Sequence, residues 1–186
     1  MLRRVALLVA LVAIATFGAS GCGDDGDDSG SEEEEEGEPI SEPICDFLGL
    51  SDDVASGVLG FEVTTASAVG DDDPSGGNCT LTPANPADGF EVTVAVFPDT
   101  EESFVSFLED YSTRPGRAGT PLWTEPVEIS GVGDLAYTLQ SPEGGFDNVW
   151  VFTNGYRFHV TDQNTTDLPG APETLESLAQ EVASNL

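Results

Sequence analysis

Two apolar, strand-like segments on either side of Asn154-Gly155 constrain the fold of this chain more than any other feature. Asn-Gly between such segments is the strongest short hairpin signal, because both residues tolerate the positive φ angles of a type I′ turn. A two-residue turn also fixes the register, so that Thr153 pairs with Tyr156 and Trp150 pairs with His159. We therefore expect an antiparallel hairpin over residues 146–161.

This register sorts the hairpin side chains onto two faces, because directly opposed residues point to the same side. One face is apolar and is expected to be core: Val149, Val151, Tyr156, Phe158 and Val160. The other joins aromatic residues to the sole histidine and an arginine: Phe146, Trp150, Phe152, Arg157 and His159. Aromatic and arginine side chains are favoured at interfaces, and Arg157 over Phe152 would be a cation–π pair. Two interpretations stay open: this is a candidate binding face, or a helix covers it and makes it a second core layer.

The rest of the chain beyond residue 43 alternates between further strands and amphipathic helices. Period-2 alternation predicts strands at 61–69, 79–82, 90–96, 123–129 and 135–139. Helical patterns predict a two-part helix at 44–59, a second helix opened by a capping box at Asp99 and Glu102, and a last helix from Pro172. Short turns imply antiparallel pairing. The fold class predicted for residues 44–186 is therefore α+β, a twisted, sandwich-like antiparallel sheet packed by about three helices.

The first 21 residues have the pattern of a secretory signal. Arg3 and Arg4 precede a short apolar run, and small residues follow it. The run is too short for a membrane span, which needs about 20 residues. The small residues end at Cys22, as in a bacterial lipobox, where the cysteine is diacylated and becomes the first residue of the mature chain. Ala19 departs from that pattern, in which leucine is commonest, and ordinary cleavage that leaves a free cysteine is the alternative.

Residues 22–43 are predicted to be an acidic tether. The segment is rich in Asp, Glu, Gly and Ser and contains neither a basic nor an aromatic residue, so it has too little apolar surface to fold alone. Beyond it remain Cys45 and Cys79, an even pair in an oxidising compartment, for which we predict a disulfide. A disulfide that closes the loop between these two cysteines stabilises the fold by roughly 4 kcal/mol in the chain-entropy model. A metal pair is the alternative, but the chain has only one histidine to complete it.

The charge balance excludes several classes of function. The chain has 35 Asp and Glu against five basic residues, a formal net charge of −30, which repels nucleic acid and anionic headgroups. The sequence contains no Gly-x-Ser-x-Gly nucleophile elbow, no set of zinc ligands and no phosphate-binding glycine loop. We therefore predict no catalytic residues, no metal and no cofactor.

Several segments resemble the small actinobacterial lipoproteins of the mycobacterial Lpp/Lpq type, whose domain has no assigned function. They are Cys22, the polar tether, Cys45-Asp46-Phe47-Leu48, Gly60, Cys79, and residues 127–136. The resemblance covers most of residues 44–186 and implies a lipid-anchored protein on the extracytoplasmic face of a bacterial membrane.

Two function classes follow from these observations. The first is a non-catalytic, membrane-anchored lipoprotein that binds an unidentified envelope protein or small ligand. The second is a hydrolase that uses paired carboxylates on sugars or cell-wall polymers. Two carboxylates facing each other across a cleft, about 5 to 10 Å apart, would favour the second.

Overall fold

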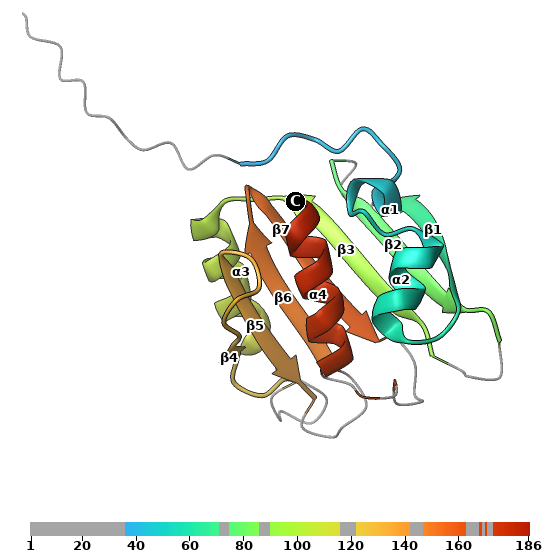
Figure 1. The fold of residues 1–186 in the computed structure, drawn as a ribbon. Coiled ribbons are helices and arrows are strands. Elements are labelled where there is room, and N and C mark those ends of the chain that lie inside the picture. Colours follow the sequence, from blue (N-terminus) through green and yellow to red (C-terminus); the bar gives the residue numbers. More distant parts are fainter. Residues whose placement is uncertain are drawn as a thin grey trace, which may run out of the picture. The chain divides into compact units, whose positions relative to one another are not determined.

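Figure 1 shows the computed structural model, which describes residues 36–70, 75–85, 90–115, 122–141, 147–162, 168, 170 and 173–186. The predicted signal sequence, Cys22 and Phe146 lie outside these ranges. Within them the elements follow in the order α1 (Ile44–Phe47), α2 (Asp52–Leu59), β1 (Val63–Val69), β2 (Gly77–Pro83), β3 (Val92–Pro98), α3 (Glu101–Ser112), β4 (Val127–Glu128), β5 (Leu135–Gln140), β6 (Asp147–Thr153), β7 (Tyr156–Asp162) and α4 (Glu173–Asn185).

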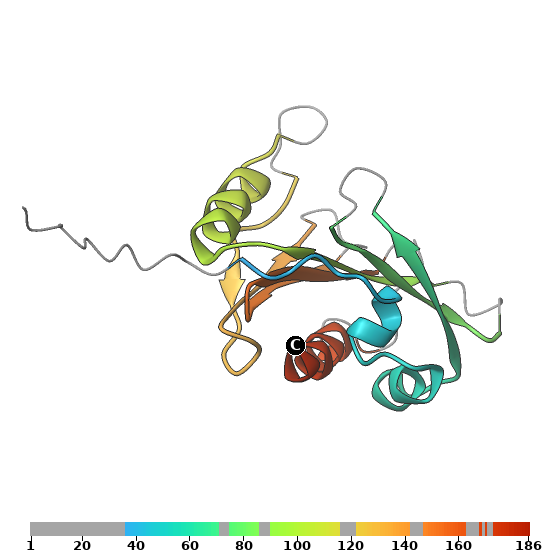
Figure 2. The ribbon, with the colours of Figure 1, turned by 90° about the horizontal axis from the view of Figure 1, so that it is seen from above.

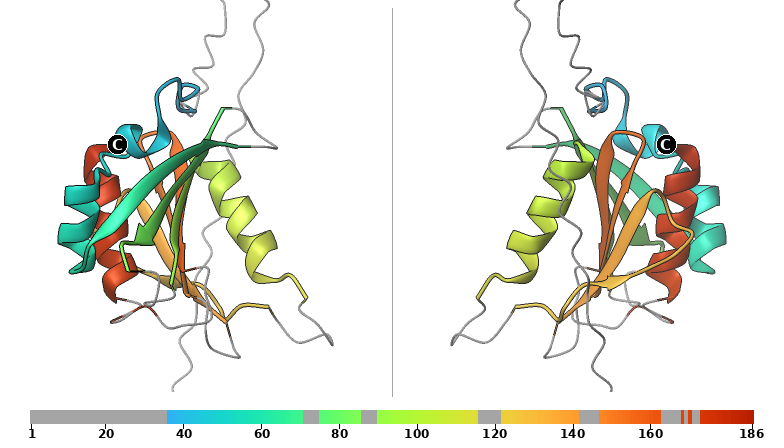
Figure 3. Two further views of the ribbon diagram at one scale, coloured as in Figure 1. Left: turned by 90° about the vertical axis from the view of Figure 1, so that its right-hand side faces the viewer. Right: turned by 90° about the vertical axis from the view of Figure 1, so that its left-hand side faces the viewer.

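The strands of the described residues form one antiparallel sheet of seven strands, in the order β1-β2-β3-β7-β6-β5-β4. Helices α1, α2 and α4 pack on one face of this sheet, and α3 packs on the other (Figures 2 and 3). The predicted α+β class with antiparallel pairing is therefore confirmed.

The β6–β7 hairpin has the register that its turn predicts. Thr153 pairs with Tyr156, Trp150 with His159 and Val149 with Val160. The turn residues Asn154 and Gly155 have φ angles of 50° and 80°, the left-handed conformation that a type I′ turn requires at both positions.

Two apolar layers lie on opposite faces of the sheet because the hairpin is apolar on both sides. The larger layer contains Val149, Val151, Phe158 and Val160 from the hairpin, packed beneath α1, α2 and α4. The smaller layer lies beneath α3 and consists of five buried residues: Phe104, Leu108, Leu139, Trp150 and Phe152. Phe104 and Leu108 are the buried residues of α3.

Several predicted element ends shift by a few residues. Thr100, rather than Asp99, is the N-cap of α3, and its hydroxyl accepts a hydrogen bond from the Ser103 N–H at 3.2 Å. The strand predicted at 123–129 is reduced to β4, since Pro126 cannot donate a ladder hydrogen bond. Phe61 and Phe90 precede β1 and β3 instead of opening them, and their rings pack edge to face with centroids 4.7 Å apart.

Side chains of α2 accept hydrogen bonds from main-chain N–H groups of β1, at the outer edge of the sheet. The Val63 N–H donates to Ser56 Oγ at 3.0 Å, and the Thr65 N–H donates to Asp52 Oδ1 at 2.7 Å. Main-chain donors that would be unpaired on an edge strand are thus bound by the helix that precedes it.

The predicted disulfide joins Cys45 of α1 to Cys79 of β2, with the two Cα atoms 4.9 Å apart. Both cysteines are buried in the larger core layer. The Cys45 N–H also donates to Ser67 Oγ at 2.9 Å, so α1 is held to both β1 and β2.

We expect the double substitution Cys45→Ala and Cys79→Ala to lower the free energy of unfolding by about 2–5 kcal/mol, because the unfolded chain regains the entropy of an open loop. Urea unfolding of both proteins, each in a Cys22→Ser background to remove the third thiol, measures the difference. A loss below about 0.5 kcal/mol would contradict a stabilising role for the disulfide.

Candidate functional site

Helix α3 covers the aromatic face of the hairpin, so the prediction of an exposed binding face at Trp150 is wrong. Trp150 is 5% exposed and Phe152 is 7% exposed. The Trp150 ring lies 4.9 Å from Phe107 and 5.0 Å from Tyr111 between centroids, and both partners belong to α3. The alternative interpretation, a second core layer, is the correct one for these two residues. Local alternation shows which residues share a face but not which helix will cover it.

Arg157 forms part of an internal ion pair on the same face. Its guanidinium lies 2.8 Å from Asp99 Oδ2, and both side chains are largely buried. The guanidinium carbon lies 4.3 Å from the Phe107 ring centroid and 5.9 Å from that of Phe97, rather than over Phe152 as predicted. Asp99 therefore serves as the counter-ion of Arg157 and not as the helix cap, which explains why Thr100 caps α3. A buried charge requires such a partner.

His159 stacks on Trp150 with ring centroids 4.3 Å apart. Desolvation by burial and, as a smaller contribution, the positive charge of Arg157 together lower the pKa of His159 to about 4. The imidazole is therefore neutral at neutral pH and packs as an aromatic ring. His159 is thus a half-buried side chain at the margin of the smaller layer, where it packs against Trp150.

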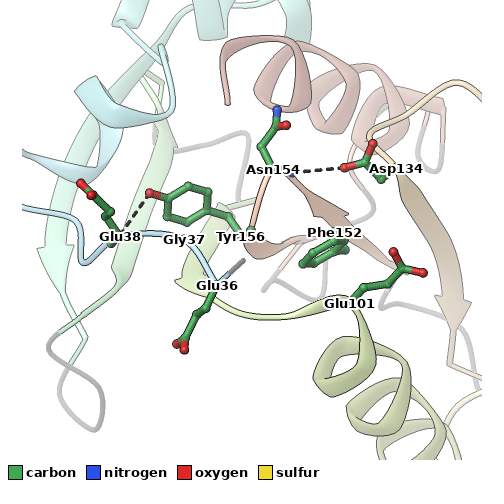
Figure 4. Close-up of a pocket in the computed structure, with 9 residues that line it drawn as sticks. Glu36, Gly37, Glu38, Glu101, Asp134, Phe152, Asn154 and Tyr156 are labelled. Atoms are coloured by element: carbon green, nitrogen blue, oxygen red, sulfur yellow. Dashed lines mark hydrogen bonds between the residues drawn. The ribbon is translucent and has the colours of Figure 1, made fainter. Parts of the chain in front are cut away.

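A pocket of about 600 Å³ lies at the tip of the β6–β7 hairpin (Figure 4). Four parts of the chain line it: the hairpin tip, the segment before α1, the first residue of α3 and the residue before β5. Its lining residues are Glu36, Gly37, Glu38, Glu101, Asp134, Phe152, Asn154, Gly155 and Tyr156. Of the predicted face residues, Phe152 contributes to this pocket, since its ring reaches from the α3 layer to the pocket wall.

Hydrogen bonds around the turn hold the pocket walls in place. The Asn154 N–H donates to Asp134 Oδ2 at 3.1 Å, and the Asp134 N–H donates to the Phe152 carbonyl at 3.0 Å. The Tyr156 hydroxyl donates to the Glu38 carbonyl at 3.1 Å across the other side of the pocket. Figure 4 shows Glu36 and Glu38 on one side of Tyr156, with Glu101 and Asp134 on the opposite side.

The pocket combines negative charge with aromatic surface. Four acidic residues line it, namely Glu36, Glu38, Glu101 and Asp134, and no lysine or arginine is among its lining residues. Such a lining repels anions and attracts cations. Phe152 and Tyr156 supply the apolar wall that a small organic ligand requires. Among the described residues, no three side chains of His, Cys, Asp or Glu are grouped so that they could hold a metal ion.

Sequence reasoning missed this pocket because its walls are distant in sequence. The Asn-Gly turn was predicted, but the return of residues 36–38 to that turn has no local signature. These residues belong to the segment predicted to be a free tether, and they lie against the domain instead.

No protein-family model, curated protein or solved structure matches this chain. The described residues include no helix with both the length and the apolar character needed to cross a membrane.

We expect the single histidine to titrate with a midpoint of about 4, against 6.5 for an ordinary histidine. The unfolded chain binds the proton more readily than the folded one between these values. The part of the free energy of unfolding that is linked to His159 is therefore at its full value above pH 6.5. It decreases as the pH drops toward 4, by up to about 3 kcal/mol.

NMR titration of the Cε1–H signal of the single imidazole gives the midpoint directly. Urea unfolding of the wild type and of His159→Gln at pH 7 and pH 4.5 gives the linked stability change, and the glutamine variant should lose less stability over this range. A midpoint near 6.5 would contradict the burial argument.

Proposed function

We propose that this chain is a non-catalytic lipoprotein, anchored on the extracytoplasmic face of a bacterial membrane, whose domain binds a small cationic ligand. The basic start, the short apolar run and the small residues before Cys22 support the anchor. The disulfide between Cys45 and Cys79 is consistent with an oxidising compartment.

The pocket at the hairpin tip is the observation that carries the binding proposal. Its volume of about 600 Å³ lies within the range of small-molecule sites, roughly 300–1,000 Å³. Acidic residues from three parts of the chain line it, and Phe152 and Tyr156 contribute aromatic rings. A ligand that carries both a positive charge and an apolar group would match this lining.

The hydrolase alternative is supported by the same carboxylates. A glycoside hydrolase needs one carboxylic acid and one carboxylate on opposite sides of the scissile bond. Glu101 and Asp134 both line the pocket and come from different elements. Release of sugar from purified cell-wall glycan, abolished by Glu101→Gln or Asp134→Asn, would replace the binding proposal with this one.

The lipid anchor predicts how the protein partitions between detergent and water. The full chain expressed in a bacterial host should enter the detergent phase, whereas Cys22→Ser should remain in the aqueous phase, because it lacks the cysteine to which the acyl chains attach. Ser20→Ala is the matched control, since it keeps a small residue before the cleavage site. Equal partition of Cys22→Ser and the wild type would contradict the anchor.

The pocket predicts a preference for cations among small aromatic probes. Phenethylamine should bind and phenylacetate should not, because the two share a ring but differ in the sign of their charge. Glu101→Gln should weaken phenethylamine binding by about two- to fivefold, the effect of one partly screened charge. NMR titration measures these affinities.

Glu109→Gln on the same helix is the control, because Glu109 is exposed and does not line the pocket. It should bind phenethylamine as tightly as the wild type. Equal affinity for phenethylamine and phenylacetate would refute a cation site.

A further inference from the structure

We propose that residues 36–40, here called the strap, dock onto the β6–β7 turn and release from it, so that they form a movable wall of the pocket. Figure 1 shows the strap, in blue, running from α1 along the end of the sheet toward the hairpin. The strap supplies Glu36, Gly37 and Glu38 to the pocket lining. The inference deepens the proposed binding function, on which its link to a ligand rests.

Between the strap and the other described residues there are three hydrogen bonds, and each joins the strap to a loop or a side chain rather than to a strand ladder. The Gly37 N–H donates to the Gly155 carbonyl at 2.7 Å, and the Ile40 N–H donates to the Ser75 carbonyl at 3.0 Å. The Tyr156 hydroxyl donates to the Glu38 carbonyl at 3.1 Å. Tyr156 is itself positioned by the Phe47 ring, whose centroid lies 5.2 Å away.

The strap buries little of its own surface. Glu36, Glu38 and Pro39 are exposed, and Ile40 is only half-buried against the larger core layer. Each hydrogen bond gives a modest net gain over the corresponding bond to water, whereas each ordered residue loses backbone entropy of at least the same size. The docked and released states of the strap are therefore close in free energy, and release does not require the sheet to unfold.

When the strap is released, the carbonyl that accepts from Gly37 still has a hydrogen-bond donor. The Gly155 carbonyl accepts a second hydrogen bond, from the Asp99 N–H at 2.9 Å. When the strap leaves, this carbonyl keeps its bond to the residue that precedes the cap of α3. No buried carbonyl becomes unpaired at the turn, so release incurs no such penalty.

Gly37 is the position where docking depends on the absence of a side chain. A Cβ atom there would lie 2.6 Å from the Gly155 carbonyl oxygen and 2.7 Å from the Tyr156 ring. The first of these is main chain in a tight turn and cannot move aside. Any larger residue at position 37 must therefore displace the strap.

Docking brings the two acidic residues of the strap to a pocket whose opposite wall is also acidic. Glu36 and Glu38 of the strap lie on the opposite side of the pocket from Glu101 and Asp134. A cation between them would be attracted to both sides and would favour the docked strap. Ligand binding and strap docking are thus coupled, and each should strengthen the other.

Amide hydrogen exchange of the full chain tests the strap without a ligand. In the wild type, the Gly37 and Ile40 amides should exchange at least about tenfold faster than the β3 and β7 amides, through local opening. In Gly37→Ala, the Ile40 amide should exchange about tenfold faster again, with β3 and β7 unchanged. Gly57→Ala is the matched control, because a Cβ at Gly57 meets nothing within 4 Å and it should leave strap exchange unaltered.

Two results would overturn the movable strap. One is exchange of the Gly37 and Ile40 amides at the rate of the β3 and β7 core. The other is wild-type protection of Ile40 in Gly37→Ala.

A second arm adds phenethylamine to the same proteins. Saturating phenethylamine should slow exchange at Gly37 and Ile40 in the wild type, and Gly37→Ala should bind it several-fold more weakly than Gly57→Ala. Binding that leaves strap exchange unchanged would overturn the coupling. Absence of binding to the wild type would refute the proposed ligand class, while opening of the strap would still be decided by the first arm.

Discussion

The rest of the structure depends on the two-residue turn at Asn154-Gly155. Its left-handed φ angles allow β6 and β7 to pair in one register, and this register places Val151 with Phe158 on one face and Trp150 with His159 on the other. A hairpin that is apolar on both faces cannot lie at a solvent-exposed sheet surface, so helices must cover it from both sides. The same turn offers the Gly155 carbonyl to two donors, which brings the start of α3 and the segment before α1 to one point.

Features determined by neighbouring residues could be predicted from the sequence. The hairpin register, the two-part helix at 44–59 and the last helix all follow from spacing within one or two elements, and the structure contains each of them. The choice between an exposed and a covered Trp150 could not be made in this way, because β4 and β5 lie between α3 and β6 in the sequence. The pocket could not be predicted from the sequence for the same reason, because Tyr156 and Glu38 are 118 positions apart.

Arg157 shows how composition shapes the interior as well as the surface. In a chain with 35 acidic residues and five basic ones, a partly buried arginine easily finds a carboxylate partner, here Asp99. Because its charge is neutralised by Asp99 and it is enclosed by the Phe107 and Phe97 rings, Arg157 does little to offset the acidic groups at the hairpin tip. The pocket therefore keeps its negative character although an arginine follows Tyr156 directly in sequence.

The occupied donors of β1 bear on how this protein would behave if the proposed lipid anchor gathered many copies on one membrane. Proteins confined to a surface meet each other far more often than in free solution, and an open strand edge would let one sheet extend into the next. Ser56 and Asp52 bind the main-chain donors of Val63 and Thr65, so an incoming strand would have to compete with bonds already formed. The short α2 helix thus disfavours edge-to-edge aggregation through β1, in addition to covering the core.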